Sequence, residues 1–591
     1  MSGSYDLLIE NTMIIDGTGK PAFRGSVGIS RAKIAAVGEV KGDAATVIDG
    51  SGLVTCPGFV DPHSHADISI LQYPLTENLV MQGITTFLGG NCGISLAPIK
   101  RSTYFFEQTM GRRKLDFDLD WRTFDEWLLK VQEVGPSVNY VPLVGHGAVR
   151  GTVMGQDFRR EATSQEIEEM KLLVDEAMRH GAFGLSAGLD YCPGDFAGVE
   201  ELVELAKVAQ EHDGLFTPHT RHHVNQWPVE HPEEYGYGLF DAPTGEIIAG
   251  RYHGLLEAVE ISRQANHIQL HIGHMTPAYI IPQPHPAFLD EAAAEATLVE
   301  VVDRARDEGL DVTYNMIAWS QSIAHAAPII ESFFSPRLLF LPEWLKALGK
   351  EEFTEKLKAK AFRDKVKGVI YSGKFKFAMI HPLTDPYWMD GYRILRCKNK
   401  AYEGKTIGEI ARKRQPDHII QAVYEESVEV VFDILVEDPE TVWALIIDKR
   451  EHGALPVFLK HPAGMPCTDV FALPATPPQM YGIPPIAYSL YPHYIRLYVK
   501  EKGVLSLEEA IKKATSVPAQ EVLGLKDRGV IREGAYADIV VFDFDRIKEG
   551  DDFLEPNRPP EGIEHVLVNG TVVYEKMAHT GAQPGKVLRH S

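Results

Sequence analysis

The sequence has few cysteines, little positive charge and no long apolar run. Five cysteines in 591 residues are too few for a disulfide framework and are typical of a reducing compartment. No apolar stretch approaches the roughly 20 residues of a membrane-spanning helix. Asp6 and Glu10 interrupt the N-terminal segment where a signal peptide needs an apolar run. These features predict a cytoplasmic protein with no membrane partner.

The shortage of basic residues also bears on partners. There are 59 Lys and Arg residues against 82 Asp and Glu residues, which gives a formal net charge of −23. An acidic surface repels phosphate backbones, so we do not expect a nucleic acid partner. The sequence has no fixed-period repeat and no low-complexity tract, and 44% of its residues are hydrophobic, as in ordinary globular proteins.

Short strands are predicted at both ends of the chain, and an alternation of strands and helices between them. Apolar runs cut by Gly and Asp, such as TMIIDGTG and HVLVNGTVVYE, predict a small β-sandwich domain from residues 1–57 and 525–591. In residues 58–524, Thr163 and Glu166 form a capping box before an apolar stripe that predicts a helix over 164–181. Eight candidate strands alternate with such helices, which favours a distorted (β/α)8 TIM barrel. A doubly wound open sheet is the alternative, weakened because no GxGxxG turn opens the first unit.

Residues 317–400 interrupt this alternation. The segment is rich in Phe, Pro, Lys and Trp and follows the seventh predicted strand, where insertions overhang the active face of a barrel. It is interpreted either as a lid or substrate-binding subdomain, or as an oligomer contact. The sequence gives no indication of the oligomeric state.

Potential metal ligands fall at the C-terminal ends of the predicted strands, where barrel enzymes place their chemistry. His63 and His65 are two residues apart, so on a strand both imidazoles leave on one face. Four further strand ends each offer one ligand type. An HxH pair or a single buried cysteine is a weak signal, but five strand ends that each carry a ligand predict a zinc site. The candidate ligands are His63, His65, Cys92, His219, His274 and Asp469.

The motifs PGFVDPHSHAD, QGITTFLGGNCGISLAP and LSLEEAIKKATSVPAQEVLGLKDRGVIREGAYADIVVFD resemble the amidohydrolase superfamily, and within it the N-acyl-D-amino-acid deacylases (D-aminoacylases). The resemblance covers nearly the whole chain. It implies that His63, His65 and Asp469 hold one metal ion, that His219 and His274 hold a second, and that Cys92 bridges the two. One or two Zn²⁺ ions per chain are consistent with it. Asp469 would be the general base, which takes a proton from water and returns it to the leaving amine.

The resemblance weakens where the deacylases hold the carboxylate of the substrate. The family's lysine, two residues after the sixth-strand histidine, is Thr276 here, and the arginine of the loop after the eighth strand is Ile486. Arg221 could compensate for these cations, or could form a salt bridge instead. Tyr191 lies at a predicted strand end near the expected pocket, and Tyr314 matches a tyrosine that the deacylases carry after the seventh strand; both are further candidate substrate contacts.

These observations predict a metal-dependent hydrolase that cleaves a non-peptide amide bond of a small molecule, an N-acyl amino acid or a related amide. The lost cations favour a bulkier or less acidic leaving group than the family norm. A cyclic amide, carbamate or lactone hydrolase of the same superfamily shares every ligand. A catalytically silent metal-binding scaffold is the alternative from another class.

Overall fold

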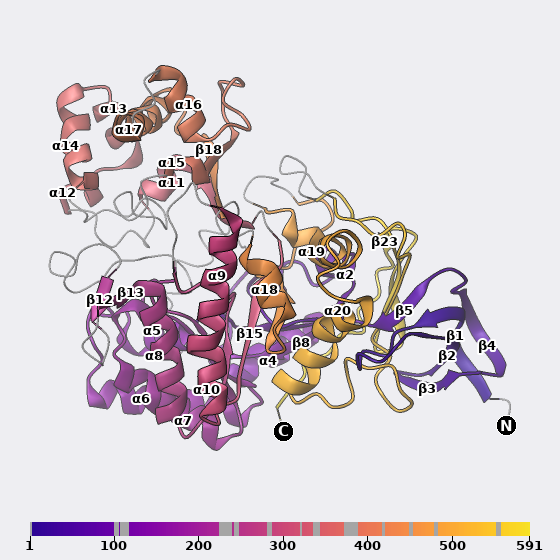
Figure 1. The fold of residues 1–591 in the computed structure, drawn as a ribbon. Helices are drawn as coiled ribbons and strands as arrows, with labels where there is room; N and C mark the ends of the chain where they lie inside the picture. Colours follow the sequence, from indigo (N-terminus) through magenta and orange to yellow (C-terminus); the bar gives the residue numbers. More distant parts are fainter. Residues whose placement is uncertain are drawn as a thin grey trace.

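The computed structural model of the chain describes most of the sequence. The described residues are 3–99, 106, 117–223, 239–241, 247–279, 286–319, 322–334, 343–371, 388–415, 420–447, 453–477, 483–550 and 557–590. The molecule has three parts: a sheet built from both ends of the chain, a set of parallel strands with helices around it, and an inserted unit (Figure 1).

Both ends of the chain contribute to one nine-stranded sheet, in which the order is β23-β22-β21-β20-β5-β1-β2-β3 and β4 pairs with β1. The two ends meet where β5 pairs antiparallel with β20, with Pro57 opposite Ile539. Figure 1 shows the indigo and yellow strands side by side at this junction. The expected β layer is present, but its strands are linked in one sheet and not in the two sheets of a sandwich. The strands are β1 (Gly3–Ile14), β2 (Phe23–Ser30), β3 (Lys33–Gly38), β4 (Gly42–Asp49), β5 (Val54–Pro57), β20 (Ile539–Phe542), β21 (Ile563–Val568), β22 (Thr571–Glu575) and β23 (Ala578–His579).

All eight segments predicted as strands of the central part are strands, in the predicted order. Every pair among them is parallel, as βαβ units require. One predicted segment is divided at Leu143 into β8 and β9, and the hydrogen bonds form two sheets, β6-β7-β8 and β19-β15-β14-β11-β10-β9. The strands are β6 (Phe59–Asp61), β7 (Ile84–Gly89), β8 (Asn139–Pro142), β9 (Val144–Gly145), β10 (Gly184–Gly188), β11 (Leu215–His219), β14 (Gln269–Ile272), β15 (Val312–Ile317) and β19 (Gly464–Cys467).

The two sheets do not close into one hydrogen-bonded barrel among the described residues, and the reason is visible at each junction. Beside β8 lies the C-terminal tail: Tyr140 N donates to Lys586 O at 2.9 Å, and Leu588 N donates to Tyr140 O at 2.7 Å. The other junction lies between β6 and β19. There the segments that follow the two strands contact each other, since Asp469 N donates to His63 O at 2.8 Å. The strand order is therefore that of a (β/α)8 unit, in which the tail of the chain replaces part of the direct β8–β10 pairing.

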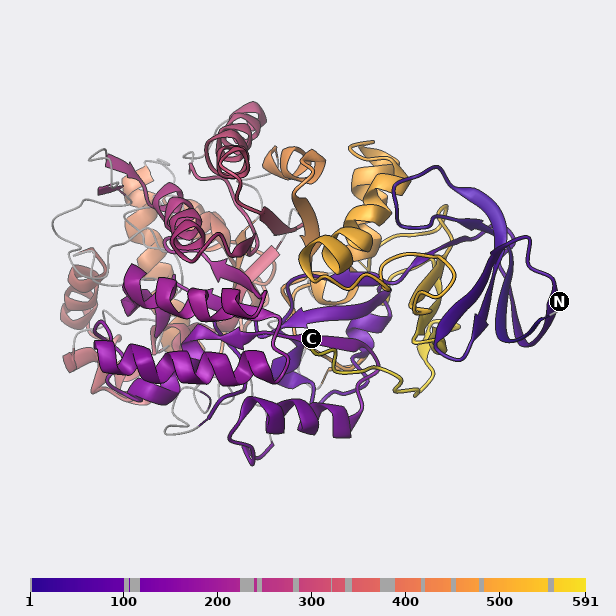
Figure 2. The same ribbon diagram turned by 90° about the horizontal axis from the view of Figure 1, so that it is seen from below.

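Helices pack around these strands, as the two views show (Figures 1 and 2). The predicted capping box is confirmed, since the Thr163 and Glu166 side chains bond to each other's backbone N–H at the start of α6. The predicted stripe of Ile167, Met170, Val174 and Met178 is buried. The helices of this part include α1 (Ala66–Ser69), α2 (Glu77–Val80), α4 (Phe124–Val134), α5 (His146–Met154), α6 (Ser164–Arg179), α7 (Val199–Glu211), α8 (Gly250–Gln264), α9 (Ala287–Thr297), α10 (Arg304–Asp307), α18 (Ala454–Lys460), α19 (Ile486–Tyr494) and α20 (Leu507–Ala514). In the described part of the chain, no helix is both long enough and apolar enough to span a bilayer.

The inserted unit has a sheet and a hydrophobic core of its own. Its sheet order is β16-β18-β17, and Trp388, Tyr392, Phe432 and Trp443 are buried in its core. The unit continues past residue 400, where the sequence analysis ended it, because β18 completes the sheet. It contains β16 (Ser322–Pro328), α11 (Ile329–Phe333), α12 (Glu343–Lys346), α13 (Lys350–Lys356), α14 (Lys360–Tyr371), α15 (Trp388–Gly391), β17 (Tyr392–Arg396), α16 (Ile407–Arg414), α17 (Ile420–Glu437) and β18 (Val442–Ile447).

Candidate metal centre

The first group of predicted ligands meets between the ends of β6, β7 and β19. His63, His65, Cys92 and Asp469 offer ligand atoms that lie within 4.8 Å of one another. Asp469 Oδ1 is 3.5 Å from His63 Nε2 and 3.3 Å from His65 Nε2. His63 Nε2 is also 3.1 Å from Cys92 Sγ. The spacing of two along the chain therefore brings both imidazoles to one carboxylate, as predicted.

The second group shares the thiol of Cys92. Its Sγ atom lies 3.9 Å from His219 Nδ1 and 3.5 Å from His274 Nε2, and these three residues again fit within 4.8 Å. Cys92 is thus common to both groups, which is the arrangement of a bridging ligand. All six predicted ligands are brought together, and none of them lies elsewhere.

Three of the six ligands have left-handed backbone conformations that non-glycine residues rarely adopt. The φ angles are 56° at Cys92, 32° at His274 and 58° at Asp469. Hydrogen bonds hold these residues, since His274 N donates to the side chain of Asn315 at 2.7 Å and Asp469 N donates to His63 O. Strained backbone of this kind concentrates at functional sites.

Polar side chains that sequence reasoning missed hold the ligands in place. Asp61 Oδ1 accepts from Thr468 N at 3.0 Å and so fixes the segment before Asp469. Ser186 Oγ accepts from Gly93 N at 3.0 Å beside Cys92. Asp190 Oδ2 lies 3.5 Å from His219 Nε2. Asp61 ends β6, Ser186 lies within β10 and Asp190 follows β10, but no spacing rule marks their partners.

Burial keeps His63 and His274 neutral, which is the form that binds metal. Burial lowers the pKa of His274 to about 3 and the pKa of His63 well below its usual range. Burial alone would raise the pKa of Asp469. The hydrogen bond from His65 and the nearby imidazoles lower it by more than burial raises it, so the pKa lies below the usual range. The donor set combines imidazole nitrogens, a thiol and a carboxylate. This set suits a divalent ion of borderline softness.

Comparison with known proteins shows which enzymes the chain is similar to. The amidohydrolase family model matches residues 487–574. D-aminoacylase of Alcaligenes xylosoxydans xylosoxydans is 27% identical over 99% of this chain and 98% of its own length, and N-acyl-D-glutamate deacylase of the same organism is 27% identical over 100% and 97%. The chain is therefore similar, over nearly its whole length, to deacylases of the amidohydrolase type.

Solved structures of D-aminoacylase-type amidohydrolases share its fold. A crystal structure of D-aminoacylase superposes with a TM-score of 0.70 at 25% identity and covers 99% of this chain and 100% of its own. N-acyl-D-glutamate deacylase from Bordetella bronchiseptica, complexed with zinc and a phosphonate inhibitor, gives a TM-score of 0.69 at 25% identity over 99% and 100%. The family resemblance seen in the sequence is confirmed.

Of the three predicted substrate contacts, only Tyr191 lies at the candidate metal centre. Its hydroxyl donates to Cys92 O at 3.0 Å, and its ring centroid is 5.0 Å from that of His219. Arg221 instead forms the salt bridge that was its alternative interpretation, because Nε is 2.9 Å from Glu257 Oε2. Its other nitrogens donate to the carbonyls of Asp195 and Ala197 at 2.9 and 2.8 Å.

Tyr314 is a correction to the sequence analysis. The residue is fully buried, and its hydroxyl donates to Phe458 O in α18 at 2.9 Å, so it lies on the helix-facing side of β15. The next residue along the strand, Asn315, points to the opposite side, as the period of two requires. Asn315 is the residue that contacts the metal centre, through His274 N.

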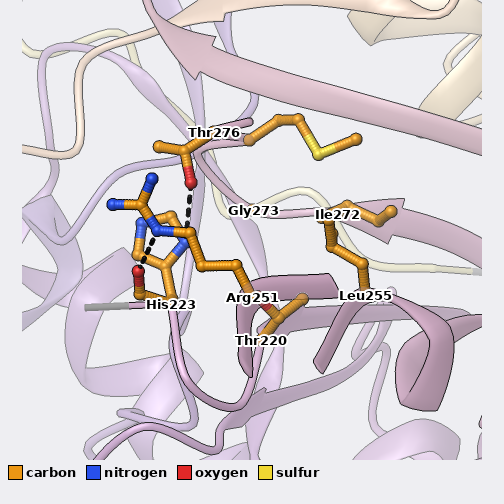
Figure 3. A pocket seen from close by; sticks show the side chains of 8 residues that line it. Thr220, His223, Arg251, Leu255, Ile272, Gly273 and Thr276 are labelled. Carbon is orange, nitrogen blue, oxygen red and sulfur yellow. Dashed lines mark hydrogen bonds between the residues drawn. The ribbon is translucent and has the colours of Figure 1, made fainter. Parts of the chain in front are cut away.

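A pocket beside the metal centre contains the position where the family's lysine was expected (Figure 3). Thr276 Oγ1 lies 3.4 Å from His223 Nδ1, and Arg251 Nε donates to His223 O at 2.6 Å. The His223 ring is 4.9 Å from that of His219 and 4.8 Å from that of His274. His223 is not among the candidate residues of the sequence analysis, because no strand pattern places it at the site. The pocket is lined by Thr220, His223, Arg251, Leu255, Ile272, Gly273, Met275 and Thr276.

Proposed function

We propose that this amidohydrolase uses one or two Zn²⁺ ions to hydrolyse the amide bond of a small N-acyl amino acid or a related amide. The observation that carries the proposal is the convergence of six ligand groups in two sets that share the thiol of Cys92. His63, His65, Cys92 and Asp469 would hold one ion, and Cys92, His219 and His274 the other. The deacylase relatives at 27% identity over nearly the full chain support the choice of reaction.

A zinc ion in this set would supply Lewis acidity, which polarises a carbonyl and acidifies water. The protein's own residues supply the rest. Asp469 is the most accessible ligand, with 28% of its side chain exposed against 1% for His63 and 9% for His65. Its carboxylate can therefore reach water and the leaving group, accept a proton from the first and pass it to the amine.

We infer a substrate that is not held by the cations of the deacylase family. Ile486 is 2% exposed in α19 and presents no charge, and the hydroxyl of Thr276 faces His223. Each charge-assisted hydrogen bond contributes about 1.5–3 kcal/mol, so the loss of two weakens the binding of a free carboxylate. Arg251 is the cationic side chain that lines the adjacent pocket. It is the first residue to test if a carboxylate is bound.

We also propose that the architecture comprises a β domain from residues 1–57 and 525–591, a barrel-like catalytic unit from 58–524, and a lid. The inserted unit from β16 to β18 follows β15, whose neighbour β14 leads into His274. Its connection to the ligand-bearing ends of the strands supports the lid role, and its separate hydrophobic core supports its description as a unit.

The test is release of free amine from a matched panel before and after chelation. The panel pairs N-acyl-D- and N-acyl-L-amino acids with analogues whose carboxylate is blocked, and includes a cyclic amide. We expect turnover that chelator abolishes and Zn²⁺ restores, with blocked or bulky amides preferred. Turnover that survives complete metal removal contradicts the proposal. A strong preference for simple N-acetyl-D-amino acids contradicts the inferred substrate, and turnover of the cyclic amide alone moves the enzyme to the other branch of the superfamily.

A matched pair of cysteine variants separates the centre from general effects on the fold. Cys92→Ser removes the thiol shared by both ligand groups, and we expect it to lower zinc affinity and turnover together. Cys397→Ser changes a thiol of the inserted unit that donates to Asn399 O and should leave both properties unchanged. Equal loss in the two variants would contradict the bridging role of Cys92.

A further inference from the structure

The segment between β10 and α7 carries two side chains that contact the metal centre. Asp190 lies 3.5 Å from His219 Nε2, and Tyr191 donates to the carbonyl of Cys92. Asp190 is 3% exposed and Tyr191 is 8% exposed, so both contacts are shielded from water. Residues 190–197 will be called the Asp190 loop.

The two nitrogens of His219 face different partners. Nδ1 points at the shared thiol, 3.9 Å from Cys92 Sγ. Nε2 is buried and, in the described residues, makes no hydrogen bond, but the Asp190 carboxylate lies 3.5 Å from it, within reach of an ionic contact. A metal-binding imidazole needs its ligating nitrogen free of a proton, and a carboxylate at the other nitrogen selects that tautomer.

Two arginines fix the Asp190 loop by its backbone. Arg221 donates to Asp195 O and Ala197 O, while its Nε is held by Glu257 of α8. Arg150 of α5 donates to Phe196 O at 3.3 Å and pairs with buried Glu201 of α7. Each guanidinium thus links the loop to a helix through a paired carboxylate. Four hydrogen bonds, two to the Glu257 carboxylate and two to backbone carbonyls, hold Arg221 against the loop.

We propose that Asp190 is a positioning residue that sets the tautomer and orientation of His219, and that Arg221 acts through the Asp190 loop to hold Asp190 and Tyr191 in place. The inference rests on the proposed metal-dependent function, because His219 acts as a ligand. It assigns Arg221 to the metal centre and removes it from substrate recognition. Asp190 and Arg221 should therefore affect the Cys92–His219–His274 group and spare the His63–His65–Asp469 side.

The experiment measures metal binding directly, without substrate. Apo enzyme of full length is titrated with Co²⁺, and the visible absorption reports cobalt bound to thiolate and imidazole. For Asp190→Ala we expect the binding phase of the Cys92–His219–His274 group to weaken about 10- to 100-fold, while the other phase stays unchanged. Asp190→Asn should lie between the wild type and Asp190→Ala, since its amide oxygen can still accept from Nε2–H. Equal metal affinity in Asp190→Ala and the wild type, or equal weakening of both phases, overturns the proposal.

The role of Arg221 is separated from a substrate role by kinetics. Arg221→Gln should weaken the same cobalt phase, and Arg221→Lys should recover only part of it because an ammonium cannot reach both carbonyls as a fork does. The double variant with Asp190→Ala should lose less than the two single variants combined. If Arg221→Gln keeps wild-type metal binding and raises KM only for substrates with a free carboxylate, Arg221 binds substrate and the proposal is wrong.

Matched controls come from ion pairs away from the centre. Asp175→Asn removes the carboxylate 2.9 Å from His212 Nε2, which is a histidine–aspartate pair on the surface. Arg263→Gln removes the arginine that bridges Glu260 of α8 and Glu308. Neither control should change the cobalt phases. If wild-type enzyme binds cobalt in both groups but hydrolyses no amide, the proposed function fails while the positioning role stands.

Discussion

At the scale of single residues, the candidate metal centre depends on the protonation state and exposure of each buried ligand side chain. Buried histidines with lowered pKa values, such as His274 at about 3, stay neutral and keep a lone pair for a metal ion. Asp469 differs from them because it is the ligand with the most exposed side chain. A carboxylate that reaches water is suited to proton transfer, whereas the histidines are suited to holding an ion.

This difference gives a prediction for Asp469→Asn. The amide keeps the size of the side chain but cannot accept a proton, so turnover should fall about 10²–10⁴-fold. Metal content should be largely retained, since Cys92 and the histidines remain, and is measured by elemental analysis of the purified variant. Asp157→Asn, at an exposed partner of Arg160, is the control. Full activity in Asp469→Asn would remove Asp469 from catalysis.

The ligands could be predicted from the sequence, and the residues that hold them could not. His63 and His65 are marked by their spacing, and the other four by their position after apolar strands. Asp190 carries no such mark, because its partner His219 is reached through the fold and not through a spacing. The left-handed φ angles of Cys92, His274 and Asp469 are likewise invisible, since no glycine signals them.

At the scale of elements, helix α6 shows how local chemistry fixes a helix start. The Glu166 side chain accepts from Thr163 N at 2.8 Å and from two nitrogens of Arg160. The hydrogen bonds from Arg160, opposed by partial burial, lower the pKa of Glu166 from 4.5 to about 2. This helix could be predicted from the sequence because its capping box and its stripe of apolar residues lie within one continuous segment.

Acid should therefore loosen the start of α6. Since the folded pKa lies below the unfolded one, the stabilisation is fully present above about pH 4.5 and is lost as the pH falls toward 2. Thr163→Ala should lower the free energy of unfolding by about 1 kcal/mol at neutral pH. Glu166→Gln should flatten the acid limb of the urea midpoint plotted against pH. The exposed neighbour variant Gln165→Ala is the control, and an acid limb unchanged by Glu166→Gln would contradict the assignment.

Elements were predicted well where periodicity decides them and less well where distant segments meet. The eight parallel strands follow from alternation, but the face of Tyr314 was misjudged because its resemblance to a family motif outweighed the period of two, which gives the inward position to Asn315. The end of the inserted unit was placed too early because β18 pairs with β16 and β17 across segments that no local pattern connects.

At the scale of the whole molecule, the C-terminal tail packs against the strands of the central part. Gly585 N donates to Pro136 O, Leu588 N to Tyr140 O, and His590 N to Gly181 O, so the tail links β8 to the start of β10. Val587 N also donates to Gln132 Oε1, which joins residues 455 positions apart. Loss of these hydrogen bonds should therefore destabilise the strands of the central part as well as the end of the chain.

Removal of residues 585–591 should lower the urea midpoint and broaden the unfolding transition. Each lost backbone hydrogen bond contributes about 1 kcal/mol, so the expected loss is several-fold larger than that of a surface ion pair. Arg589→Ala, which removes only the side chain paired with Asp125, is the control and should cost at most about 1 kcal/mol. Equal midpoints for the truncated and control proteins would show that the tail is peripheral.

The pairing of β5 with β20 has a consequence for biosynthesis. On the ribosome, β5 (Val54–Pro57) is synthesised long before β20 (Ile539–Phe542), the strand with which it pairs. At about 5–20 residues per second, the delay is roughly half a minute to a minute and a half. Throughout that interval β5 presents an unpaired edge, which is a template for pairing with another nascent chain. The yield of native enzyme should therefore depend on chaperones that shield the first five strands until translation reaches the last four.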